Sequence, residues 1–143
     1  MKKLGKNIQR ALTGASVAAA AFALSVTPAF AGSNLHLQAY SEECTLGTSC
    51  IVIEHADGYF YYNGDSWKVC DNYPDGDRAV LHLFWSDSSG SWTRTIQDTN
   101  GSGNSCATGS KNIDEGTTVY VSVWHQNGAG GTAKDVRNGT GKA

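Results

Sequence analysis

The sequence has no long apolar run after residue 31, and basic residues are few in that part of the chain. A transmembrane helix needs about 20 consecutive apolar residues, so none is predicted there. Four of the 11 basic residues but none of the 13 acidic ones lie in residues 1–31, which leaves the rest with a formal net charge of about −6. This balance lacks the basic footprint of a nucleic-acid-binding protein, and the length is too short for a two-domain enzyme.

Residues 1–31 have the three parts of a secretory signal peptide. A basic start over residues 2–10 precedes an apolar run from Ala15 to Val26, and Ala29-Phe30-Ala31 forms a small-x-small cleavage pattern. We therefore expect a secreted, extracellular protein with a single domain over residues 32–143 and no membrane segment after cleavage.

All four cysteines follow residue 31, and an even number in a secreted chain predicts two disulfides with three possible pairings. We favour Cys44–Cys50, which closes a short turn-compatible loop, and Cys70–Cys106, which ties a strand to a distant polar loop. Structural zinc usually needs cysteines two to four residues apart. The gaps here are five, 19 and 35 residues, so disulfides are the better interpretation.

Helical patterns are nearly absent from this part, whereas short aromatic and β-branched runs alternate with turn residues. The clearest runs are Arg78–Ser86 and Thr117–Gln126. The residues expected on their apolar faces are Ala79, Leu81, Leu83 and Trp85 in the first, and Val119, Val121 and Val123 in the second. Weaker strands are predicted at Leu35–Tyr40, Ile51–His55, Gly58–Tyr62, Ser66–Asp71, Trp92–Asp98 and Ala133–Arg137.

Turn signals join these runs at hairpin spacing, among them Asn63-Gly64 and Ser88-Ser89-Gly90. About seven or eight strands predict an all-β fold, an antiparallel two-sheet β-sandwich of immunoglobulin-like type, with a closed barrel as the alternative. Residues Asn100–Lys111 are expected to form a long polar loop, and Asn138–Ala143 a frayed tail.

The order of several features resembles small secreted actinobacterial proteins of unknown function. The segments that carry the resemblance are Gly58–Tyr62, Gly64-Asp65, Val69-Cys70-Asp71, Asp75-Gly76, Gly101–Cys106 and Glu115-Gly116. The resemblance covers about residues 58–140 and implies a disulfide-linked β-sandwich. It brings no catalytic residue to this chain.

The turn from Asp71 to Asp77 is acidic and is bent by Pro74 and Gly76. Asp71, Asp75 and Asp77 are candidate calcium ligands, because calcium takes six to eight oxygen ligands and extracellular sites are often weak. The alternative is a solvated turn in which the Asp side chains cap nearby backbone N–H groups.

Aromatic side chains are numerous and form the candidate ligand-binding set, since exposed rings stack on sugars and serve protein interfaces. The candidates are Trp92, Trp124, Tyr120, Tyr59 and Tyr61. We expect Trp92, directly after a hairpin turn, to be the most exposed tryptophan. The alternative is that the rings fill the core and cover the sheets.

Support for catalysis in the sequence is thin. The cysteines are expected in disulfides, and no Gly-x-Ser-x-Gly nucleophile elbow is present. His55, His82 and His125 would form a metal site only if the fold brings them together. We therefore expect a protein that is not an enzyme, with no cofactor apart from a weak possibility of calcium.

The expected function is a secreted binding protein that recognises a polysaccharide or cell-surface ligand through exposed aromatics. The alternative is a small protein-binding effector, either a hydrolase inhibitor or a toxin-like antagonist. Such an inhibitor needs a rigid protruding loop, because preorganisation lowers the ordering cost of binding. The loop Thr45–Ser49, with Leu46 near its tip, is the candidate.

Overall fold

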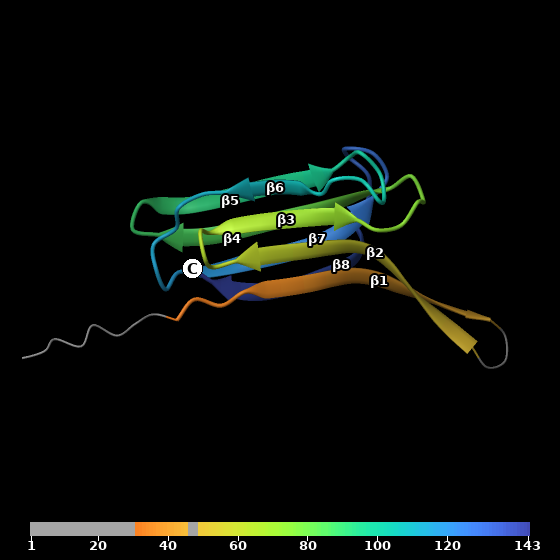
Figure 1. Ribbon diagram of the computed structural model, residues 1–143, viewed down its shortest axis with the longest axis horizontal. Coiled ribbons are helices and arrows are strands. Elements are labelled where there is room, and N and C mark those ends of the chain that lie inside the picture. Colours follow the sequence, from red (N-terminus) through yellow and green to blue (C-terminus); the bar gives the residue numbers. More distant parts are fainter. Residues whose placement is uncertain (1–30, 46–48) are drawn as a thin grey trace, which may run out of the picture.

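Two four-stranded antiparallel sheets pack face to face in the computed structural model, which describes residues 31–45 and 49–143 (Figure 1). The first sheet has the order β1 (Leu35–Thr45), β2 (Ser49–Tyr61), β3 (Ser66–Asp71) and β6 (Ala107–Ser110). The second has the order β5 (Gly90–Asp98), β4 (Arg78–Asp87), β7 (Thr118–Gln126) and β8 (Lys134–Lys142). The predicted two-sheet β-sandwich is confirmed. The signal peptide expected at residues 1–31 lies outside the described residues except for Ala31.

Most of the strand order is that of an immunoglobulin domain, with no counterpart of strand D and with one strand added. β2, β3 and β6 lie side by side as strands A, B and E do, while β4, β7 and β8 match C, F and G, with β5 beside β4. β1 is the additional strand, and it pairs with the outer edge of β2. The described residues contain no helix, so none of them forms an apolar helix long enough to span a membrane.

The core lies between the inner faces of the two sheets and follows the predicted alternation. Leu81, Leu83 and Trp85 of β4 are fully buried, as are the inner valines of β7. Trp85 packs against Trp67 of β3 with ring centroids 6.1 Å apart. Because successive strand residues point to opposite faces, each strand contributes alternate residues to the core, and Ile113 and Ala143 join it from outside the strands.

Two strand predictions need correction. The runs predicted as Ile51–His55 and Gly58–Tyr62 belong to one strand, β2, and the loop predicted at Asn100–Lys111 contains β6. The β6 sequence, Ala107–Ser110, is short and pairs with β3 although it lacks apolar alternation.

The predicted frayed tail is wrong. β8 continues to Lys142, and Ala143 is buried. Gly141 makes this possible, because a Cβ at that position would lie 2.5 Å from Cδ1 of the core residue Phe60. The tail therefore closes the core instead of leaving it.

Both predicted disulfides are present. Cys44–Cys50 links β1 to β2 near their hairpin end, and Cys70–Cys106 links β3 to the residue before β6. The two bonds join residues six and 36 positions apart. Cys50 lies in the part of β2 that does not pair with β3, because that pairing begins at Ala56. Cys70 lies in the paired part of β3, opposite Asp57.

Removing Cys70–Cys106 by double substitution to Ala is expected to lower the free energy of unfolding by about 4 kcal/mol, because the bond closes a long loop. Removing Cys44–Cys50 is expected to cost about 2 kcal/mol or less, since its loop is short. Urea unfolding of both double variants measures the difference. Equal losses would contradict the expected order.

Candidate functional site

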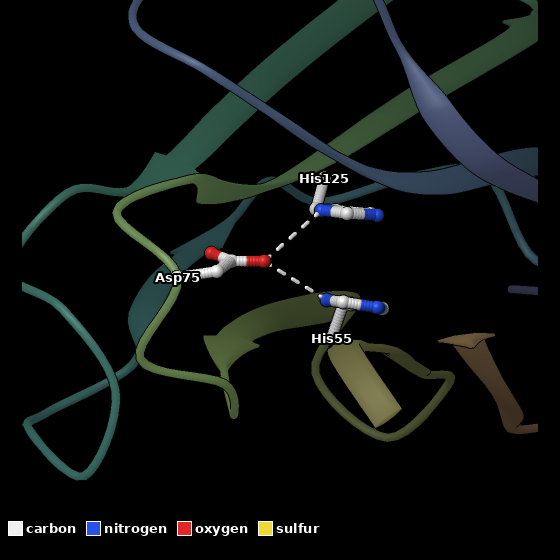
Figure 2. Close-up of side chains that lie close together, drawn as sticks. All are labelled: His55, Asp75 and His125. Carbon is white, nitrogen blue, oxygen red and sulfur yellow. Dashed lines mark hydrogen bonds and ion pairs between the residues drawn. The ribbon is translucent and has the colours of Figure 1, made fainter. Parts of the chain in front are cut away.

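Two histidines from opposite sheets meet at one end of the core (Figure 2). His125 follows the buried row of Val119, Val121 and Val123 on the inner face of β7. His55 is the extra residue of a β-bulge in β2, because Ala39 pairs with Ala56 while the next residue of β1 pairs with Glu54. A bulge re-aims the side chain it contains. The two buried rings lie face to face, with centroids 3.9 Å apart and planes 5° from parallel.

Three carboxylates surround this histidine pair. Oδ2 of Asp75 lies 3.0 Å from Nδ1 of His55 and 3.7 Å from Nδ1 of His125. Nδ1 and Nε2 of His125 each lie 2.9 Å from an oxygen, of Asp77 and Asp135 respectively. Both ring nitrogens of His125 therefore lie within hydrogen-bond distance of a carboxylate, which fixes the orientation of the ring.

Asp77 bonds to a lysine as well as to His125. Nζ of Lys134 lies 2.7 Å from its Oδ2. Burial acts to raise the pKa of Asp77, but hydrogen bonding to Lys134 and the charges of Lys134 and His125 hold that pKa below its ordinary value. Asp77 therefore remains an anion that fixes the orientation of His125.

Asp135 reaches His125 through a local distortion of β8. Val123 pairs with Arg137 and His125 with Lys134, which leaves one extra residue on β8 between these pairs. Within this bulge Asp135 has a φ of 52°, a left-handed conformation that is uncommon for residues other than glycine. Such strain persists where surrounding contacts require it.

Ser41 of β1 extends the hydrogen-bonded chain on the other side of His55. Its Oγ lies 2.9 Å from Nε2 of His55, while Nδ1 of the same ring faces Asp75. Oδ1 of Asp75 accepts a 2.8 Å bond from the backbone N–H of Asp77, which orients the carboxylate. The chain Ser41–His55–Asp75 thus joins two strands and the β3–β4 turn.

Among the described residues, His55, Asp75 and His125 are the group with metal-ligand spacing, and their ligand atoms lie within 4.8 Å of one another. Imidazole lone pairs lie in the ring plane, and a zinc ion needs to be about 2.1 Å from each nitrogen. An ion shared by two parallel rings would lie far out of both planes. Metal binding therefore requires rotation of at least one ring, whereas the observed arrangement suits hydrogen bonds.

The third histidine proposed for a metal site is elsewhere. His82 is half-buried, and its Nδ1 lies 2.9 Å from Oγ1 of Thr95 in the neighbouring strand. It alternates with the buried Leu81 and Leu83, so it belongs to the outer face of β4. The fold brings together His55 and His125 only.

The three aspartates of the acidic turn make two kinds of contact. Asp75 and Asp77 face the histidines, whereas Oδ1 of the buried Asp71 accepts a hydrogen bond from the N–H of Tyr73. Asp71 and Asp75 each bond to a backbone N–H two residues later, which is the capping role weighed against calcium. Burial, with the nearby charges of Asp75, Asp98 and Asp77, raises the pKa of Asp71.

The candidate aromatics lie on different surfaces. Tyr59 and Tyr61 alternate with the buried Phe60, so they are on the outer face of the first sheet. Tyr120 and Trp124 alternate with the inner valines of β7, so they are on the outer face of the second. The five candidates therefore do not form one continuous platform.

Several of these rings are already covered. His36 stacks on Tyr59 at 4.3 Å, and Nζ of Lys68 lies 4.4 Å from the Tyr59 centroid. Trp92, expected to be the most exposed tryptophan, is half-buried, packs against the core and has Nζ of Lys111 4.3 Å from its ring centroid. Trp124 is also half-buried, and its Nε1 donates to Gln126.

Tyr120 is the exposed member of the set, at 55 %. It lies 6.1 Å from Phe84, a ring that pairs with it across β4 and β7 and is 38 % exposed. Phe84 was not among the sequence candidates, although its alternation with Leu83 and Trp85 placed it on the outer face.

Beyond the sandwich, β1 and β2 continue as a two-stranded projection, the arm, made of residues 42–45 and 49–53 (Figure 1). Cys44–Cys50 links its strands. Ile51 and Val52 are 58 % and 64 % exposed, more than any other large hydrophobic residue in the described ranges. Leu46, the candidate contact residue of the inhibitor hypothesis, lies outside the described residues.

Comparisons of the chain with protein-family models, with curated proteins and with solved structures found no match.

Asp71→Asn is expected to raise the free energy of unfolding at pH 7. Because the pKa of Asp71 is raised on folding, the folded state binds its proton more tightly, and wild-type stability falls as the pH rises from the ordinary carboxyl value to the raised one. Asn removes the charge and keeps an acceptor for Tyr73. Urea unfolding should show the gain at pH 7 but not at pH 3. A loss at both pH values would contradict this account.

Proposed function

We propose that the protein is secreted and acts outside the cell by binding another protein through the arm. The observation that carries this proposal is that Val52 and Ile51, the most exposed large apolar residues described, lie together on a disulfide-linked hairpin. Apolar side chains in that position gain most when a partner covers them. The two disulfides are compatible with an oxidising, extracellular location.

The covalent link lowers the cost of binding. Cys44 and Cys50 are paired across the two strands, so part of the arm is ordered before a partner arrives. The arm also has strand edges that β3 does not cover, since β2 pairs with β3 only from Ala56 onward. Open edges of this kind bind extended segments of partners by adding a strand.

Charge indicates the kind of surface that fits the arm. Glu42 lies opposite Val52, and Glu43 lies opposite Ile51. Each face of the arm therefore combines one carboxylate with an exposed apolar side chain. A partner with a basic, apolar groove complements both, and extracellular hydrolases are the class we propose.

Val52→Ser is expected to weaken binding to such a partner at least about tenfold, a loss of about 1.4 kcal/mol. The test measures binding and inhibition for a panel of purified proteases, glycosidases and lysozyme-type hydrolases against residues 32–143. Val136→Ser is the matched control, because Val136 is an exposed valine of β8 outside the arm.

Melting temperatures of both variants should match the wild type, because neither valine is in the core. Equal weakening by Val52→Ser and Val136→Ser would contradict recognition by the arm. Failure to bind any hydrolase class in the panel would contradict the inhibitor form of the proposal.

The exposed Phe84–Tyr120 pair supports polysaccharide recognition as a second candidate. Thr93 and Thr140 lie opposite these rings on the neighbouring strands, so hydroxyl groups flank the aromatic surface. Aromatic rings of this kind can stack on the apolar C–H face of a sugar while nearby hydroxyls bond its oxygens.

Retention on insoluble chitin, cellulose or whole cell walls tests this second candidate. Tyr120→Ala should abolish retention, whereas Tyr73→Ala, at an exposed tyrosine of the acidic turn, should not. Retention that requires added calcium would implicate Asp71, Asp75 and Asp77. Unchanged retention of Tyr120→Ala would exclude the Phe84–Tyr120 surface.

A further inference from the structure

Ser41, His55 and Asp75 are connected in the order that nucleophilic catalysis by serine requires. Ser41 Oγ lies 2.9 Å from His55 Nε2, and Asp75 Oδ2 lies 3.0 Å from His55 Nδ1. We infer that these residues form a hydrolytic site for small, neutral carboxylic esters. This activity is separate from partner binding by the arm and goes beyond the proposed function.

The two hydrogen bonds select the state of His55 that the chemistry needs. Asp75 accepts the hydrogen of Nδ1, which leaves the lone pair of Nε2 directed at the hydroxyl of Ser41. In this state His55 is the general base, Ser41 is the nucleophile and Asp75 orients the ring.

Groups other than Ser41 and Asp75 also hold the His55 ring in place. His125 stacks on the His55 ring, and Asp77 and Asp135 bind both nitrogens of His125. Burial of His55 at 8 % exposure further restricts its rotation. A catalytic group needs this kind of support from its surroundings.

Ser41 and Asp75 are more accessible than the base between them. Ser41 is half-buried and Asp75 is exposed, so the nucleophile lies near solvent at the base of the arm. A cationic group is close to the same strand. Nη2 of Arg137 lies 3.3 Å from the carbonyl oxygen of Tyr40, the residue before Ser41. The same guanidinium lies 4.3 Å over the Tyr40 ring, and its Nη1 donates to the carbonyl oxygen of Val136.

The surroundings limit the substrate. Carboxylates of Asp75, Asp77 and Asp135 lie around the histidines, so an anionic acyl group is disfavoured. Ser41 is half-buried on its strand, which favours a short acyl group such as acetyl. The inferred substrates are therefore neutral esters of short acids.

The reaction balances with water as the only co-reactant. Ser41 Oγ bonds to the ester carbonyl carbon as its proton moves to His55 Nε2. The tetrahedral intermediate expels the alcohol, which takes that proton, and leaves acyl-Ser41. Water then attacks the acyl carbon, gives its proton to His55, and releases the acid as the proton returns to Ser41 Oγ.

The test uses residues 32–143 with both disulfides formed, a fluorophosphonate probe and 4-nitrophenyl acetate. Intact-mass measurement and peptide mapping should show one phosphonylated residue, Ser41. Ester turnover and the labelling rate should both fall at least about 100-fold in Ser41→Ala and in His55→Gln.

Asp75→Asn separates catalysis from folding, because Asn keeps the size of the side chain and an acceptor for the N–H of Asp77. It should lose labelling while its melting temperature stays near that of the wild type. Ser91→Ala, at an exposed serine of β5 outside the arm, is the matched control and should leave labelling unchanged. No adduct, an adduct on another residue, or turnover that survives Ser41→Ala would overturn the inference.

Discussion

Contact between the inner faces of the two sheets is the interaction on which the rest of the structure depends. Trp85 and Trp67 pack against each other across it, and the inner residues of β4 and β7 are buried beside them. Because only alternate residues of each strand point into this contact, the residues between them lie on the outer faces of the sheets and can make other interactions. The histidine pair continues the same inner rows, so the candidate site is the polar end of the core rather than a feature added to its surface.

Much of the fold could be predicted because the alternation of apolar and polar residues along a strand is visible in the local sequence. The apolar faces of Arg78–Ser86 and Thr117–Gln126 are the observed inner faces of β4 and β7. Both disulfides were also predicted, since loop length and turn residues distinguish the pairings. The incorrect strand and tail predictions occurred where contacts with distant strands, rather than the local sequence, determine the structure. β6 depends on its pairing with β3, and the end of β8 depends on the space that Gly141 leaves for Phe60.

The candidate site could be predicted only in part, because its geometry depends on register. The sequence named His55, His82 and His125 as one conditional set, and only two of them meet, because two bulges aim the groups of this site and neither has a sequence signature here. Ser41 was not a candidate at all, since its contact with His55 arises from β1–β2 pairing across one of those bulges. The aromatic candidates lie on more than one surface for a related reason. Alternation along a strand predicts which face of its own sheet a ring occupies. It does not predict whether rings from different strands belong to the same sheet.

The position of the arm has a consequence for how this protein changes over time. Residues 42–45 and 49–53 have their own covalent closure and extend past the region where β3 pairs with β2. Substitutions there alter exposed side chains without repacking Trp85 and its neighbours. The proposed recognition by the arm can therefore diversify while the sandwich stays constant, and foreign sequences could be grafted between Cys44 and Cys50 to make new binding reagents.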